Sequence, residues 1–147
     1  MALSLSKDLK NFIISKGIVE AMAGTCGTGG TTSLKIYNGT KPDNADAATN
    51  GTQLCEIIGI GWGYAYGETS GTAALGTAGG YTGTAAASGT AGWARMTTIS
   101  TGYTGSAATF SIDGEVGTAA TSVFVINSTV LTEDGLVTLL TAPISLG

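Results

Sequence analysis

Short apolar runs with a two-residue period, separated by turns rich in Gly, Thr and Asp, dominate the chain from residue 33 onward. The clearest runs cover residues 33–37, 53–60, 93–100, 122–127 and 136–145. Alternation of this kind is typical of strands that bury one face, and seven to nine such strands suit a sandwich or a barrel. The sequence therefore predicts a mainly β fold, an antiparallel β-sandwich or barrel.

The N-terminal part has a different period. Over residues 4–23, Leu5, Leu9, Phe12 and Ile13 recur at helical intervals, and a glycine-rich stretch follows at 24–32. We predict a short helical arm with a hinge over 1–32 and a β-sandwich domain over 33–147. The apolar stripe of the arm is narrow, so the helix needs a partner surface to be stable.

Several connections are predicted from local turn chemistry. A long polar loop holds Pro42 over residues 38–52, Asp113-Gly114 is predicted to close a hairpin, and residues 133–135 form a further turn. Residues 68–92, rich in Gly, Thr and Ala, are expected to form a long loop or a pair of edge strands. In the segment 61–67, alternation predicts that Trp62, Tyr64 and Tyr66 share one face of an edge strand.

Charge is scarce and unevenly distributed. Five of the six basic residues lie in the first 41 positions, and the rest of the chain combines Arg95 with eight acids. A basic end on an acidic body suggests an arm that docks on an acidic partner, although solvated lysines on a helix are the simpler alternative. Charged residues make up 11% of the chain, about half or less of the usual share, which suggests surfaces covered by other subunits.

Side chains that perform chemistry are few. The chain has no histidine, which excludes Ser-His-Asp and Cys-His arrangements, and the acidic pairs 113/115 and 133/134 flank turn glycines. Asp43, Asn44, Asp46 and Asn50 resemble calcium ligands, but Asx turns explain them better. Two cysteines without metal spacing complete the inventory: Cys55 is expected to be a buried hydrophobe, and a disulfide with Cys26 stays open. We expect no enzymatic activity, no metal and no cofactor.

The chain also lacks features of other protein classes. Its start carries charges where a signal peptide needs an apolar core, and no run approaches the length of a spanning helix. We therefore expect synthesis in the cytoplasm and no membrane partner. The net charge of −4 disfavours binding of the whole domain to nucleic acid.

Four segments resemble a group of small structural proteins of tailed-phage virions. In chain order they are LSKDLKN (5–11), IYNGTKPDNADAATNGTQLCEI (36–57), GTAGWAR (89–95) and IDGEVG (112–117), which is also their order in that group. One departure is Ala94, where the group usually places a bulky aromatic residue. The resemblance implies a virion component, made in the host cytoplasm, rather than a particular place in the virion.

These observations lead to one preferred function and two alternatives. We expect a capsid decoration, or cement, protein that binds the major capsid protein or other virion subunits and forms a homo-oligomer, with a trimer as one option. The alternatives are a tail, neck or fibre-associated structural protein, and a glycan-binding adhesin that uses the aromatic strand. The residues expected to contact partners are Lys7, Lys10, Phe12, Lys16, Trp62, Tyr64 and Tyr66.

Overall fold

The computed structural model describes residues 32–60, 62–63, 72–75, 80–100, 108–142 and 144–145. The predicted helical arm and hinge lie outside these residues, except that the first strand already begins at Thr32. Twelve strands are described: β1 (Thr32–Tyr37), β2 (Gln53–Ile58), β3 (Trp62–Gly63), β4 (Thr72–Leu75), β5 (Tyr81–Thr84), β6 (Gly89–Thr90), β7 (Trp93–Ser100), β8 (Ala108–Gly117), β9 (Phe124–Ile126), β10 (Val130–Leu131), β11 (Leu136–Thr141) and β12 (Ile144–Ser145).

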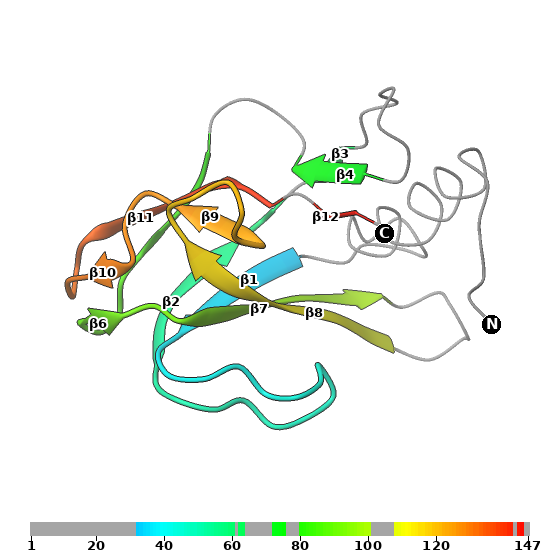
Figure 1. Cartoon of the computed structure of the whole chain (residues 1–147), viewed down its shortest axis with the longest axis horizontal. Helices are drawn as coiled ribbons and strands as arrows, with labels where there is room; N and C mark the ends of the chain where they lie inside the picture. The colour runs from blue at the N-terminus through cyan, green and yellow to red at the C-terminus, as the bar shows by residue number, and fades with distance from the viewer. Residues whose placement is uncertain are drawn as a thin grey trace.

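Seven strands form one curved sheet in the order β2-β1-β7-β8-β9-β11-β5 (Figure 1). Two small sheets accompany it, β10-β6 and β12-β4-β3. All pairings are antiparallel except that of β8 with β9, which is parallel. The prediction of a mainly β fold is confirmed, and among the described residues no helix occurs. The main sheet is nearly closed, as in a barrel.

The two ends of the main sheet, β2 and β5, meet at a narrow seam. Cys55 and Ala85 form an antiparallel bridge there, and the amide of Ala86 donates a hydrogen bond of 2.8 Å to the carbonyl of Leu54. Gly83 makes this approach possible, because a Cβ at that position would stand 2.6 Å from the carbonyl oxygen of Glu56. Glycine therefore lets the backbones of β2 and β5 approach each other.

Alternation along the strands separates an inner from an outer face. On β1, Leu34 and Ile36 are fully buried, and they lie opposite Met96 and Ala94 of β7. The inner face also takes up Phe124, Leu139 and Cys55, all of them fully buried. The strand β9, in the run predicted to be central, lies between β8 and β11 with all three residues buried. Burial of these side chains is the main favourable contribution to folding of the barrel.

The expected hairpin at Asp113-Gly114 is wrong. Both residues lie inside the ten-residue strand β8, where Asp113 pairs with Arg95 and Gly114 with Ala94. Gly114 has a packing role instead, because an added Cβ would lie 2.4 Å from Cγ1 of Val123. The turn expected at 133–135 is confirmed by a hydrogen bond from the amide of Gly135 to the carbonyl of Thr132.

Candidate functional site

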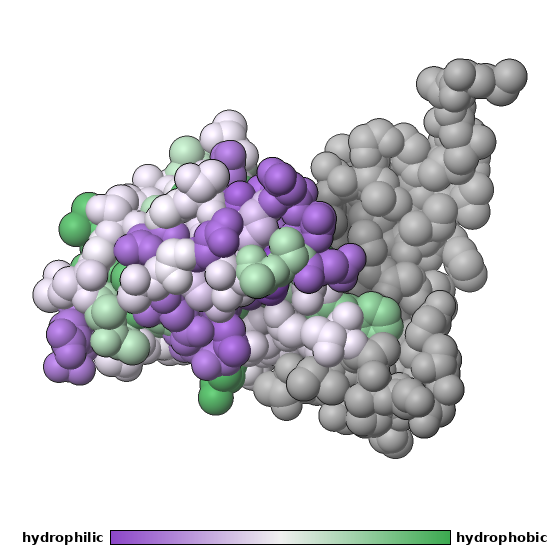
Figure 2. Space-filling model, turned by 90° about the horizontal axis from the view of Figure 1, so that it is seen from below, coloured by the Kyte–Doolittle hydropathy of each residue, from purple (hydrophilic) through white to green (hydrophobic). Residues whose placement is uncertain are grey.

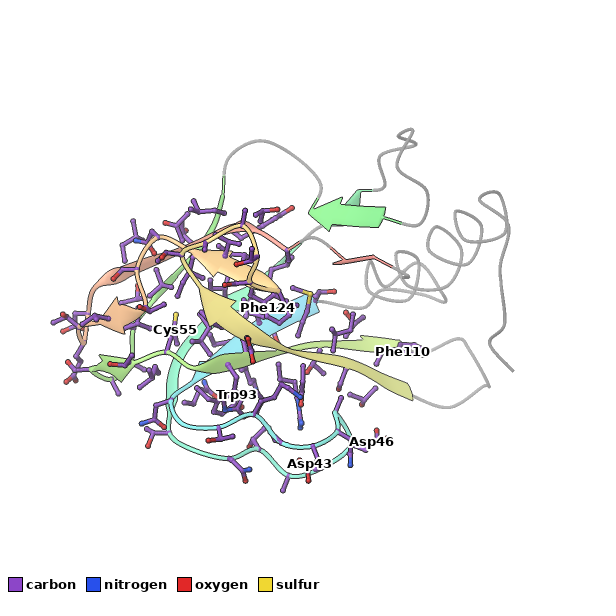
Figure 3. The ribbon with its side chains drawn as sticks, viewed as in Figure 1. Asp43, Asp46, Cys55, Trp93, Phe110 and Phe124 are labelled. Atoms are coloured by element: carbon purple, nitrogen blue, oxygen red, sulfur yellow. The ribbon has the colours of Figure 1, made fainter. Side chains whose placement is uncertain are left out.

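The loop 38–52 between β1 and β2 lies across the outer face of β1, β7 and β8, and we call it the strap (Figure 3). Neighbouring antiparallel strands can be joined by two residues, so a connection of this length needs a reason of its own. The strap covers Trp93, an outward-facing side chain of β7 that is nevertheless fully buried. Seen from the strap side, the surface is mostly hydrophilic or neutral (Figure 2).

A buried ion pair holds the middle of the strap. The guanidinium of Arg95 donates from Nε to Oδ1 of Asp113 and from Nη2 to Oδ2, both at 2.7 Å. Its third contact is a hydrogen bond of 2.8 Å from Nη1 to the carbonyl oxygen of Ala47 in the strap. The two side chains are only 13% and 4% exposed, so this pair lies within the protein. Such a two-bond arrangement fixes geometry as well as charge.

Aromatic rings complete the cluster. Tyr37 and Trp93 stack with their centroids 4.6 Å apart, and the Arg95 guanidinium lies 5.7 Å from the Trp93 ring. The hydrogen bond with Asp113 raises the pKa of Arg95, and so this side chain keeps its positive charge. The indole Nε1 of Trp93 is buried, and among the described residues it has no hydrogen-bond partner. The cluster of Tyr37, Trp93, Arg95 and Asp113 therefore works as a second, partly ionic core beneath the strap.

Glycines and amide groups fix the two ends of the strap. The amide of Gly92 donates to the carbonyl of Tyr37 at 2.9 Å, and an added Cβ at Gly92 would lie 2.4 Å from the carbonyl oxygen of Gly39. Asn38 closes the loop. Its backbone N–H donates to the carbonyl of Thr52, and its side-chain Oδ1 accepts a hydrogen bond from the backbone N–H of Thr52. The strap is thus anchored at both ends as well as in the middle.

Among the described residues, the cysteine and the Asp/Asn cluster of the strap have structural roles. Burial, followed by the negative charge of Glu56, raises the pKa of the Cys55 thiol, which keeps it protonated and unreactive. Its Sγ donates a weak hydrogen bond to the carbonyl of Thr84. The expected Asx turn is present, because Asn44 Oδ1 accepts a hydrogen bond from the amide of Asp46. Within the described ranges, no three His, Cys, Asp or Glu residues converge on a potential metal site.

The residues predicted to contact partners are not brought together by the described structure. Lys7, Lys10, Phe12, Lys16, Tyr64 and Tyr66 lie outside the described residues. Trp62 lies in β3, where its backbone pairs with Leu75, but its side chain is not described. These contacts therefore stay predictions.

Sequence reasoning missed the Arg95–Asp113 pair. One signal was available: Arg95 is the single basic residue after position 41, and it stands in an otherwise uncharged strand. A lone charge in such a strand calls for a partner, since an unpaired buried charge is costly. The partner itself could not be chosen, because Asp113 had been assigned to a turn.

No protein-family model matches the chain, and the searches of curated proteins and of solved structures returned no match. Over the described residues there is no helix with the length and apolar character needed to cross a bilayer.

Proposed function

We propose that the chain is a structural component of a tailed-phage virion, and specifically a decoration protein that stabilises the head shell. One observation carries the proposal: three of the four segments that resemble the phage group meet around the strap. Residues 36–57 hold the end of β1, the strap and most of β2; residues 89–95 include β6 and the start of β7; residues 112–117 lie in β8. The residues that carry the resemblance thus lie in one packed scaffold, which supports a structural role.

The properties of the surface also support a role in an assembly. Four large aliphatic side chains are more than half exposed: Ile58 (68%), Leu136 (66%) and Leu140 (56%) on the barrel, and Val130 (69%) on the small sheet β10-β6. Such exposure, combined with few charged residues, favours contact with other subunits over existence as a free monomer. The anchored strap adds rigidity, which lowers the entropy lost on binding.

The mechanism in this proposal is mass action. A protein that binds only the assembled shell stabilises it by RT ln(1 + [L]/Kd) for each site. The contacts are assigned to the basic arm residues Lys7, Lys10 and Lys16 with Phe12, and to the aromatic strand Trp62, Tyr64 and Tyr66. Oligomers, a trimer among them, would bury further weakly charged surface.

The test combines copy number with a charge reversal. Purified virions are expected to hold this protein in numbers comparable with those of the major capsid protein, measured on a stained gel. Particles assembled with Lys7→Glu and Lys10→Glu are expected to lose occupancy and heat resistance, whereas Lys41→Glu on the strap serves as the control. Full occupancy and unchanged heat resistance in the arm variant would contradict docking through the arm.

Other outcomes point to the alternative functions. Copy numbers far below that of the capsid protein would place the chain in the tail, neck or fibre. Loss of binding to the host surface in Trp62→Ala, at unchanged particle stability, would favour a glycan-binding adhesin.

A further inference from the structure

The outer side of β2, β5 and β11 carries exposed aliphatic side chains, and no other described element lies over them. Because side chains alternate, the outward residues here are Glu56, Ile58, Thr82, Thr84, Leu136, Thr138 and Leu140, and we call them the aliphatic face after its three large apolar members. Leu136 lies opposite Thr84 and Thr138 opposite Thr82, while the Cys55–Ala85 bridge places β2 beside β5. Ile58, Leu136 and Leu140 are each more than half exposed.

This face contrasts with the outer face of β1, β7 and β8. There the strap covers Trp93 completely, so the chain supplies its own cover. The charged member of the aliphatic face is Glu56, which forms a half-exposed pair at 3.9 Å with Lys35 of the neighbouring strand β1. The other side chains of the face are neutral, and its three large aliphatic side chains gain free energy when apolar surface covers them.

The dimensions of the aliphatic face fit one helix. Leu136 and Leu140 are four residues apart on one strand, about 13 Å, and three strands span about 10 Å. A stable interface with a second protein needs roughly 800 Å² on each partner, several times this footprint. An α-helix is about 10–12 Å wide with its side chains, which matches the width of the face.

We propose that the N-terminal segment 4–23 of the same molecule docks on the aliphatic face as a helix. Leu5, Leu9, Phe12 and Ile13 form its apolar stripe, and the rise from Leu5 to Ile13 is about 12 Å, close to the Leu136–Leu140 spacing. In such a helix Lys16 follows on the stripe side, where Glu56 offers an acidic partner. Lys7 lies on the opposite side, and Lys10 lies on the flank next to Ile13. Docking would therefore leave Lys7 and Lys10 free for a further partner.

The segment 4–23 joins the barrel close to the aliphatic face, so it has only a short distance to span. β1 starts at Thr32, whose carbonyl accepts a hydrogen bond of 3.1 Å from the amide of Ile60, two residues beyond Ile58. Residues 24–31 can span up to about 26–29 Å when extended, enough to return the segment over the same face. A tether of this length gives millimolar effective concentrations, so docking within one molecule outcompetes docking on a second copy in dilute solution.

Hydrogen exchange of the full-length protein tests the proposal. We expect the amides of residues 5–16 to exchange about tenfold or more slowly than in an unfolded peptide, at a rate independent of protein concentration. The variant Leu136→Ser with Leu140→Ser should abolish this protection. Val130→Ser, which removes an equally exposed aliphatic side chain from β10, should preserve it. Protection of Val137 and Leu139 in β11 verifies that the barrel is still folded.

Each alternative result overturns the proposal. Unprotected amides in the unmodified protein would show that the segment does not dock. Equal protection in the Leu136→Ser, Leu140→Ser variant would place it elsewhere on the molecule. Protection that rises with protein concentration, together with a dimer mass in sedimentation, would assign the face to a second copy. The measurement needs no virion, so failure of docking and failure of the proposed function are seen in different assays. Docking within one molecule would reassign Phe12, Lys16 and the aliphatic face from contacts with other subunits to contacts within the chain, and would leave Lys7 and Lys10 for the virion.

Discussion

Replacing Asp113 by Asn should cost more stability than any other single change of charge on the described barrel. The substitution keeps the size of the side chain but removes the charge that faces Arg95 across two bonds of 2.7 Å. With side chains only 13% and 4% exposed, solvent compensates little for the loss. Removing one partner of a buried pair costs about 3–5 kcal/mol, and the remaining contact of Arg95 with Ala47 places this case near 3 kcal/mol.

Urea denaturation followed by tryptophan fluorescence measures this cost, and calorimetry should show a fall in Tm of about 6–12 °C. Glu56→Gln is the matched control, because its pair with Lys35 is half exposed with the charged atoms 3.9 Å apart. Such surface pairs contribute about 0–1 kcal/mol. The double variant Arg95→Met, Asp113→Leu should recover most of the loss, since it leaves no buried charge unpaired.

The reasoning fails if Asp113→Asn and Glu56→Gln cost the same. It also fails if the double variant loses as much unfolding free energy as Arg95→Met and Asp113→Leu lose together when each is made alone. Either result would mean that the strap is held by its ends and by the aromatic stack, without help from the ion pair.

Two further predictions concern the seam and the strap. Burial raises the pKa of the Cys55 thiol above its ordinary value of 9.0, so the stability it contributes is complete below that pH and decreases as the pH rises beyond it. The fall in unfolding free energy between about pH 8 and pH 10 should therefore be smaller in Cys55→Ala than in the unmodified protein; equal falls would contradict the burial of the thiol. Gly92→Ala should cost about 1–3 kcal/mol through its contact with Gly39 and speed hydrogen exchange in the strap. Gly59→Ala is the comparison, because its φ of 74° is unfavourable for alanine but its surroundings are open, so the strap should exchange as before.

The strands that pack by local alternation were predictable. Residues 93–100 were predicted as a strand and form β7, and 33–37 and 53–60 differ from β1 and β2 by one or two residues at their ends. Leu34, Ile36 and Met96 alternate with polar neighbours, so one buried face is visible in the sequence itself. The failure at Asp113-Gly114 has a clear cause. This dipeptide is a strong turn signal locally. In β8, however, Arg95 pairs with the charge of Asp113, and the side chain of Val123 fills the space that Gly114 leaves free.

The candidate site divides in the same way. The long polar connection 38–52 and its Asx turn followed from composition and local hydrogen bonding. That this connection folds back over β7 depends on Ala47 and Arg95, which are 48 residues apart, and no local pattern pairs them. The sequence also did not reveal that Trp93, on an outward position of its strand, is buried beneath the strap.

By itself, then, the sequence determined that the chain would form short strands with one apolar face, because a period of two and frequent glycines leave few other structures. Only the tertiary structure decided how the strands close, through the approach of Gly83 to β2, and which outer face is covered. The physical reason is that alternation is a property of neighbours along the chain, whereas closure and cover depend on single contacts between distant residues. Such contacts are favourable only after the whole sheet has formed.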